Sequence, residues 1–157
     1  MLRRIVAGLS AVTLSGLATP GLAAEAACDT PAARAAVEAA VRGWFAAAAK
    51  DDAAGVQRLS APTFFAYDAG QRLEGPALFN MVRGAHAQGL VLEWNLSRFV
   101  IHADCHIAWA AWENHGRVGP PGALQPIEWQ ESASLSQTSA GWVLEFLHSN
   151  RVEPTKP

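Results

Sequence analysis

The chain has 157 residues, of which 50% are hydrophobic, and its formal net charge is −2. This length supports one sizeable hydrophobic core and is too short for two ordinary domains. No cluster of Lys and Arg residues indicates a surface that would bind nucleic acid. The composition therefore predicts a single globular domain and excludes a dedicated nucleic-acid-binding protein.

The first 24 residues have the layout of a secretory signal peptide. Arg3 and Arg4 precede an apolar stretch over residues 5–17, and small residues close the segment. The apolar stretch is shorter than the ~20 residues that a membrane-spanning helix needs. The expected cleavage points are after Ala23, Ala24 or Ala26. We therefore expect an exported protein, periplasmic or extracellular, with no membrane span after cleavage. A transmembrane anchor and a lipoprotein anchored at Cys28 are the alternatives.

The two cysteines of the chain are Cys28 and Cys105. An even number of cysteines in an oxidising compartment favours a disulfide bond. This bond would link the start of the first helix to a hairpin of the sheet, and the loop-entropy model assigns it roughly 3 to 5 kcal/mol. Two unpaired cysteines are the alternative, because the sequence does not show whether the two Cα atoms approach each other.

Helical periodicity dominates the first half of the mature chain. Thr30 followed by Pro31 is typical of a helix start, and the apolar residues that follow recur at helical spacing. Asp51 or Asp52 can cap a short second helix, which Pro62 is expected to stop. The three helices are expected at about residues 31–50, between Asp52 and Pro62, and from Gly75-Pro76 to just before Gly89.

The remaining segments predict β-structure. Aromatic and apolar residues run from Thr63 to Asp68, and Ala69-Gly70 supplies a turn before residues 71–74, which predicts a small hairpin. From residue 91 onward the hydrophobic period changes to 2, which is typical of strands. Four long antiparallel strands are expected at residues 91–102, 105–115, 127–138 and 141–151. A loop rich in Gly and Pro is expected over residues 116–126.

The closing hairpin carries a family resemblance. The segment Trp129-Gln130-Glu131-Ser132 leads through a polar turn into residues 141–149, which begin Gly141-Trp142. This hairpin resembles the last hairpin of SnoaL-like proteins in the NTF2-like superfamily, and Ala108-Trp109 is similar to a second strand of that family. The resemblance covers residues 31–151. It implies an α+β cone, in which three N-terminal helices pack on a curved, mainly antiparallel sheet, within a domain over residues 25–157.

The resemblance implies a fold and no single activity. The superfamily includes isomerases, dehydratases, polyketide cyclases, transport factors and binding modules. Ketosteroid isomerase, related by fold, uses a tyrosine with two acidic residues, which invites comparison with Tyr67 and Asp68. The match fails because Tyr67 is the only tyrosine and does not lie in the first helix. Asp68 is interpreted as a turn residue before Ala69-Gly70.

Two polar residues of the closing hairpin are expected among apolar neighbours. Alternation places Glu131 on the apolar face of its strand. On the last strand, the expected shared face holds Trp142, Leu144, Phe146, His148 and Asn150. A carboxylate in a dry core must be hydrogen-bonded, have a raised pKa or face a cavity. The functional hypothesis makes Glu131 or His148 a general base. The alternatives are a core histidine and a structural pair of Glu131 with His148 or Arg98.

Aromatic residues suggest the ligand. All tryptophans except Trp44 lie in the sheet half, and aromatics that line a concave sheet suit a small apolar or aromatic molecule. The expected ligand-lining residues are Trp109, Trp129, Phe146, Trp44 and Tyr67. The leading hypothesis is therefore an exported domain that binds such a molecule in a conical pocket. The alternatives are a cofactor-independent isomerase, dehydratase or cyclase, and a homodimeric interaction module.

Other site chemistries have weaker support in the sequence. His102, Asp104 and His106 have metal-binding side chains, but they straddle a predicted turn, so no metal site is expected. No nucleophile elbow, P-loop or dinucleotide fingerprint is present, and no cofactor is expected.

Overall fold

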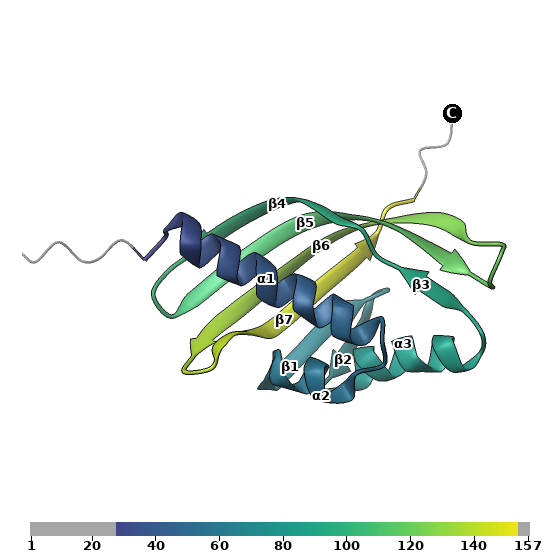
Figure 1. The fold of residues 1–157 in the computed structure, drawn as a ribbon, viewed down its shortest axis with the longest axis horizontal. Helices are drawn as coiled ribbons and strands as arrows, with labels where there is room; N and C mark the ends of the chain where they lie inside the picture. Colours follow the sequence, from purple (N-terminus) through teal and green to yellow (C-terminus); the bar gives the residue numbers. More distant parts are fainter. Residues whose placement is uncertain (1–27, 154–157) are drawn as a thin grey trace, which may run out of the picture.

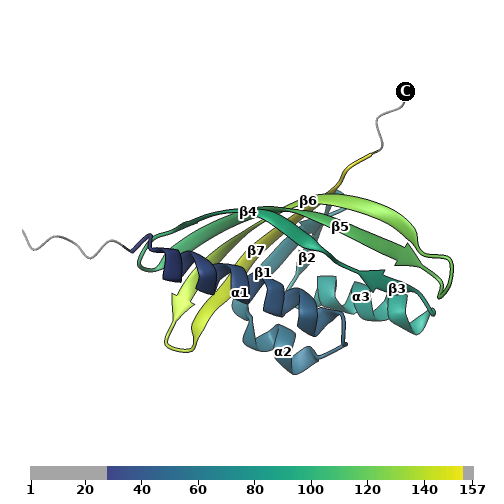
Figure 2. The same ribbon diagram turned by 45° about the horizontal axis from the view of Figure 1, so that its top comes forward.

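Three helices lie on the concave face of one strongly curved, seven-stranded sheet (Figures 1 and 2). The computed structural model describes residues 28–153, so the predicted signal peptide lies outside the described residues. The helices are α1 (Pro31–Ala48), α2 (Ala53–Arg58) and α3 (Ala77–Ala87). The strands are β1 (Ser60–Asp68), β2 (Gln71–Glu74), β3 (Val91–Glu93), β4 (Leu96–Ala103), β5 (Ile107–Gly119), β6 (Gln125–Thr138) and β7 (Gly141–Arg151). The expected α+β cone is confirmed.

The sheet is mainly antiparallel, with one parallel pair. Its strand order is β2-β1-β7-β6-β5-β3, and β4 also pairs with β5. The N-terminal strand β1 lies parallel to the C-terminal strand β7, while the other pairs are antiparallel. This parallel pair joins the first hairpin to the long C-terminal meander. Residues of the first strand and of the last strand therefore lie side by side in one sheet.

The helix starts follow from side-chain capping. The Thr30 hydroxyl accepts a hydrogen bond from the Ala33 amide at 3.1 Å, and Pro31 occupies the first turn of α1. Asp52 caps α2 by accepting from the Gly55 amide at 2.9 Å. The buried stripe of α1 includes Trp44, which is fixed by a 3.0 Å hydrogen bond from its indole to the Ser60 hydroxyl. Of the two predicted caps for the second helix, Asp52 is the one observed.

Several expected boundaries are wrong. Pro62 does not stop α2, which already ends at Arg58, but lies within β1. Regular pairing of β1 with β7 resumes only at Phe65, so the missing N–H of Pro62 removes no ladder hydrogen bond there. The strand expected over residues 91–102 is interrupted at residues 94–95, which separates β3 from β4.

The Gly/Pro-rich loop is shorter than expected, because β5 extends to Gly119 and β6 begins at Gln125. Gly116 belongs to β5, where the Trp129 ring of β6 covers it. A Cβ atom at Gly116 would lie 2.6 Å from Cζ3 of Trp129. The glycine is therefore a contact surface for the aromatic ring, not a turn residue.

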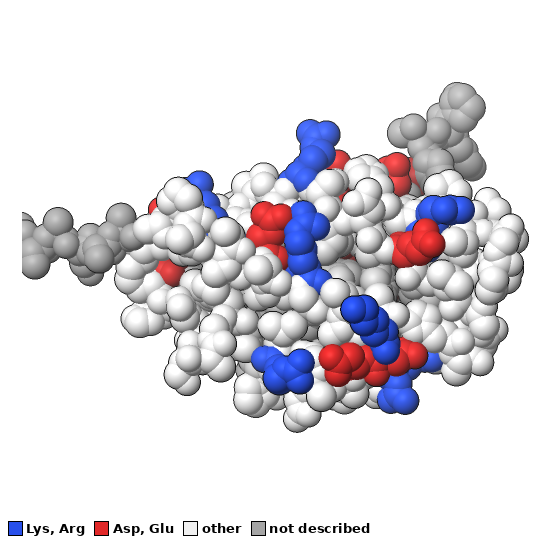
Figure 3. Space-filling view, in the orientation of Figure 1, with Lys and Arg blue, Asp and Glu red and all other residues white. Residues whose placement is uncertain are grey.

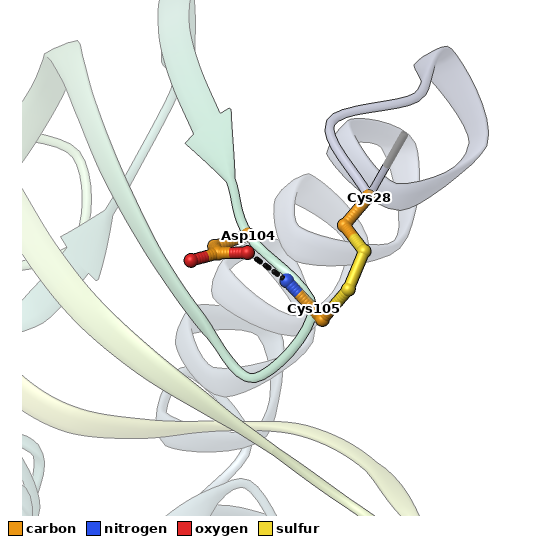
Figure 4. The surroundings of a disulfide bond; sticks show 3 residues. All are labelled: Cys28, Asp104 and Cys105. Carbon is orange, nitrogen blue, oxygen red and sulfur yellow. Dashed lines mark hydrogen bonds between the residues drawn. A yellow bond between two sulfur atoms is a disulfide. The ribbon is translucent and has the colours of Figure 1, made fainter. Parts of the chain in front are cut away.

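A disulfide bond between Cys28 and Cys105 fastens the start of α1 to the β4–β5 turn (Figure 4), which confirms the predicted pairing. The two Cα atoms are 4.9 Å apart. Asp29 reinforces the same junction, because it binds Arg34 at 2.6 Å, His102 at 3.1 Å and the Ala103 amide at 3.3 Å. The hydrogen bond from Arg34 lowers the pKa of Asp29 to about 2. In residues 28–153, no helix is long and apolar enough to cross a membrane.

Reduction of the Cys28–Cys105 bond should lower the free energy of unfolding by about 3 to 5 kcal/mol, because the bond closes a long loop. The two cysteines are 77 positions apart in the sequence. Urea denaturation with and without reductant measures the change. The Cys28→Ser/Cys105→Ser double variant is the control, since reductant should not move its midpoint. An unchanged midpoint of the reduced wild-type protein would contradict the prediction.

Candidate functional site

A row of polar side chains crosses the concave face of the sheet. Trp112 on β5 pairs with Glu131 on β6, and Glu131 pairs with Ser149 on β7. Ser149 in turn pairs with Asp68 at the end of β1. Because directly opposite residues on neighbouring strands share a face, these four side chains lie side by side. Two carboxyl groups from distant parts of the sequence thus flank one serine hydroxyl.

Glu131 is the fixed centre of this row. Its side chain is buried, and Oε2 accepts hydrogen bonds from the Trp112 indole at 2.7 Å and from the Asn114 amide at 2.9 Å. Asn114 is also buried, and its Oδ1 accepts from the Asn95 backbone amide at 3.1 Å. The Asn95 amide thus fixes the orientation of the Asn114 side chain that donates to Glu131.

Burial determines the protonation of both carboxyl groups. It raises the pKa of Glu131 to about 6, against the opposing effect of hydrogen bonds from Asn114, Trp112 and Ser149. The negative charge of Asp68 raises the pKa of Glu131 further. Burial also raises the pKa of Asp68, while Ser149 and His148 favour its charged form. Near neutral pH, the site therefore holds a carboxylate that can accept a proton at modest cost.

Ser149 connects the two carboxyl groups chemically. Its hydroxyl interacts with both Glu131 and Asp68 and is itself buried. A hydroxyl has one proton to donate and two lone pairs that accept. When one carboxyl group is protonated, Ser149 can accept from it and donate to the other. The charge of Asp68 also affects the titration of Glu131.

The row borders a small apolar cavity between the helices and the sheet. The cavity has a volume of about 100 Å³. Its walls come from α1, α3, β1, β3, β6 and β7, with Trp94 from the β3–β4 connection. The apolar lining consists of Trp44, Phe45, Leu78, Val82, Leu92, Trp94, Trp129 and Leu147, and the polar lining of Asp68, Glu131 and Ser149. An engineered apolar cavity of roughly 150 Å³ binds benzene, so this one suits a smaller molecule or the end of a longer one.

Solved structures with this architecture are known. No protein-family model matches the chain, and no curated protein sequence matches it. An NTF2-like protein of unknown function from Pseudomonas putida KT2440 superposes with a TM-score of 0.65 at 20% identity, covering 82% of this chain and 99% of that one. This chain has the NTF2-like fold.

Two further neighbours show how widely the NTF2-like fold is used. A ketosteroid isomerase-like protein from Erwinia carotovora atroseptica SCRI1043 matches with a TM-score of 0.64 at 16% identity, covering 80% of this chain and 100% of that one. A CaMKII hub from S. rosetta matches with a TM-score of 0.64 at 14% identity, covering 76% of this chain and 96% of that one. At these identities the similarity establishes the fold, and the site must be judged by its own residues.

The NTF2-like cone encloses three of the residues expected at the site. Glu131, Trp44 and Trp129 line the interior cavity. The expected face of Trp142, Leu144, Phe146, His148 and Asn150 is wrong, because β7 contains a β-bulge. Leu135 pairs with Leu144 and the adjacent Ser134 pairs with Phe146, so Glu145 is an extra residue. One extra residue reverses the alternation, which turns Leu147 and Ser149 inward and His148 outward.

The other expected site residues lie on the convex face, where Tyr67 of β1 and Trp109 of β5 are in register with residues of β6 and β7. His148 is exposed and stacks on Phe146, with ring centroids 6.5 Å apart. Tyr67 also contacts Phe146, at 5.9 Å between centroids, and is 41% exposed. Trp109 is 48% exposed and lies beside His102. None of these four expected residues lines the interior cavity.

The expected structural pairs of Glu131 are absent as well. The structure does not bring His148 and Glu131 together, because they face opposite sides of the sheet. Arg98, the other suggested partner, lies 3.4 Å from Glu113 instead.

Asp68 and Ser149 are the site residues that sequence reasoning missed. Ala69 and Gly70 both have positive φ, as a tight two-residue hairpin turn requires, so Asp68 is the first position of the turn and also the last residue of β1. Alternation from the buried residues Phe64 and Ala66 would have placed Asp68 on the inner face. For Ser149 the sequence gives no comparable signal, because its direction depends on the bulge.

Among the described residues, the interior cavity is lined by two side chains of metal-binding type, Asp68 and Glu131, and they are not part of a larger cluster. Within residues 28–153, the grouping that could hold a metal ion consists of Cys28, Asp104 and Cys105. The two sulfur atoms are bonded to each other and are therefore not thiolate ligands. His102 pairs with Asp29 at 3.1 Å.

Glu131 should make the protein less stable as the pH rises from 4.5 to 6. Its folded-state pKa of about 6 exceeds the ordinary value of 4.5, so the folded protein retains a proton that the unfolded chain loses. The free energy of unfolding should fall by about 2 kcal/mol over this window and then level off. Urea denaturation across this range, compared between wild type and Glu131→Gln, isolates the effect.

Glu128→Gln is the matched control for this measurement, because Glu128 is exposed on the opposite face of the same strand. It should retain the wild-type pH dependence. If Glu131→Gln and the wild type lose stability in parallel between pH 4.5 and 6, then Glu131 does not have the raised pKa.

Proposed function

We propose that this NTF2-like domain binds a small, largely apolar carbonyl compound in its interior cavity and catalyses proton transfer on it without a cofactor. The observation that carries the proposal is the row Glu131–Ser149–Asp68 at the edge of an apolar cavity. Apolar walls suit the body of the molecule, and the few polar groups suit one reacting end. The reaction class is that of an isomerase or a lyase.

The pKa of Glu131 supports its role as the general base. A base works best when its pKa lies near the working pH, and burial raises the pKa of Glu131 to about 6. Glu131 would take a proton from the carbon next to the carbonyl group, and the electron pair of that C–H bond would move toward the carbonyl oxygen. Returning the same proton to another carbon completes an isomerisation with no net proton change.

Asp68 and Ser149 suit the complementary role. The Ser149 hydroxyl can donate a hydrogen bond to the oxygen on which charge develops. Burial raises the pKa of Asp68, and the negative charge of Asp68 raises the pKa of Glu131, which makes Glu131 a stronger base. Ser149 would hold the hydrogen bond between the two groups in the ground state.

The cavity limits the size of the substrate. Pockets for drug-sized molecules are typically about 300 to 1,000 Å³. The interior cavity, at about 100 Å³, is well below this range. The proposal therefore concerns short-chain or small cyclic carbonyl compounds, not polycyclic ones.

Exchange of the protons next to the carbonyl group of cyclopentanone in D₂O, followed by NMR, tests the proposal. The wild-type protein should accelerate exchange, with a rate that rises as the pH passes about 6 and then levels off. Glu131→Gln should lose the acceleration by at least about a hundredfold, whereas Glu128→Gln should keep it. Asp68→Asn should move the inflection to lower pH and lower the rate, because the negative charge of Asp68 contributes to the raised pKa of Glu131.

Binding without chemistry is the outcome that separates the two leading hypotheses. If cyclopentanone shifts the NMR signal of the Trp129 indole but its protons do not exchange faster, the domain is a binding module and the catalytic proposal fails. Equal exchange rates for wild type and Glu131→Gln would also refute it.

The export of the domain is part of the proposal. The leader-like N-terminal sequence and the Cys28–Cys105 disulfide both support an oxidising compartment, the periplasm or the extracellular space. Mass spectrometry of the secreted protein would give the N-terminal residue. An intact Met1 on protein isolated from the periplasm would contradict signal-peptide cleavage.

A homodimer that forms through the convex face is a second candidate. Exposed apolar residues on this face include Tyr67 on β1, Val100 on β4, Ile107 and Trp109 on β5, and they flank the small Ser132 and Ser134 of β6. Exposed apolar surface rimmed by polar residues supports protein association. Sedimentation should show a dimer that Trp109→Lys weakens, while a monomeric wild-type protein would exclude this candidate.

A further inference from the structure

A second and larger cavity lies between α2, β1 and α3. Its volume is about 590 Å³, within the range of roughly 300 to 1,000 Å³ that is typical of pockets for drug-sized molecules. Apart from Trp44, none of its lining residues borders the interior cavity with the two acids. The Trp44 ring is thus a shared wall, held by its hydrogen bond to Ser60. The two cavities are separate compartments of the cone.

The walls of this second cavity are apolar. Val56 of α2, Ala61 and Phe64 of β1, and Phe79 of α3 all line it and are otherwise buried. These side chains are already largely shielded from water, so an apolar occupant would contact them without displacing much of their hydration. The polar groups of the lining include the amides of Gln57 and Asn80. The cavity thus suits an apolar body with a polar end.

Arg83 of α3 supplies the charge for that polar end. It is exposed, lines the cavity, and its guanidinium lies 5.7 Å from the centre of the Phe79 ring. The arginines of α1, α2 and β2 each have a carboxylate partner: Arg34 has Asp29, Arg42 has Glu38, Arg58 has Asp52 and Arg72 has Glu74. In the described part of the chain, Arg83 has no such ion pair.

The carboxylate that shares a hollow with Arg83 contacts a different side chain. Asp51 borders the shallow hollow next to the cavity together with Arg83, but it pairs with His86 at 2.9 Å. Figure 3 shows acidic and basic side chains interspersed over the helical face, without a broad field of either sign. A cation stacked on an aromatic wall, at the mouth of an apolar cavity, is complementary to a carboxylate on an apolar chain.

We propose that the cavity between α2, β1 and α3 is a binding site for an apolar carboxylate, such as a medium-chain fatty acid, whose carboxylate pairs with Arg83. The apolar chain lies against Val56, Phe64 and Phe79, and Asn80 is within the same lining to contact the head group. This site is independent of the proposed proton-transfer site, because no acidic residue of that row lines it.

Titration with decanoate, followed by NMR, tests the site. Binding should shift the side-chain amide signals of Gln57 and Asn80 and the Trp44 indole signal, and should leave the Trp129 indole signal unchanged. Decanol, which lacks the charge, should bind about tenfold more weakly, and decyltrimethylammonium should not bind measurably. Acetate should bind too weakly to detect, because it lacks the apolar body.

Variants of Arg83 test the contribution of its charge to binding separately from the contribution of the apolar cavity. Arg83→Gln should weaken decanoate binding about tenfold and leave decanol binding unchanged, and Arg83→Lys should restore part of the affinity for decanoate. Arg58→Gln is the matched control, because Arg58 is exposed on α2 and does not line the cavity. Unchanged decanoate affinity in Arg83→Gln would overturn the proposal.

A variant that fills the cavity with a larger side chain tests the location of the binding site without changing any charge. Ala53→Phe, at an exposed position of the lining, should weaken both decanoate and decanol, whereas Ala54→Phe, on the same helix but outside the lining, should weaken neither. Glu131→Gln should leave decanoate binding intact, so failure of the proton-transfer proposal and failure of this one are distinguishable. Shifts at Trp94 and Trp129 in place of Gln57 and Asn80 would overturn the assignment to this cavity.

Discussion

The two hydrogen bonds from Trp112 and Asn114 to Glu131 are the interaction around which the interior of the cone is organised. A buried carboxylate is unfavourable unless its lone pairs have donors, and these two donors come from one face of β5 directly beside it. These hydrogen bonds stabilise the charged form of Glu131 and so oppose the effect of burial, which raises its pKa to about 6. Without these two donors, Glu131 would be a neutral acid or would distort the sheet.

The parallel pairing of β1 with β7 places a second acid near Glu131. β1 joins the sheet beside β7, which brings Asp68 next to Ser149 and so within one strand of Glu131. An all-antiparallel meander over the second half of the chain would contain Glu131 but would place no second acid beside Ser149. The pairing of the first strand with the last strand thus places a second carboxyl group near the buried Glu131.

Trp44 separates the interior of the cone into two environments of different chemistry. On one side, two acids border a cavity of about 100 Å³, and on the other, a cavity of about 590 Å³ opens toward Arg83. Opposite charge at the two cavities favours different ligands in each. In this chain α1 supplies the shared wall through Trp44, while α2 and α3 contribute to the larger cavity.

Local sequence determined the elements of this protein, and long-range packing decided its site. Capping by Thr30 and Asp52, helical and strand periods, and the inward face of Glu131 are all properties of neighbouring residues, so the sequence alone predicts them. The direction of His148 and Ser149 depends on the extra residue Glu145, which is visible only as a register shift between β6 and β7. The approach of Asp68 to Ser149 likewise exists only after β1 pairs with a strand about eighty residues away, a contact that no local pattern encodes.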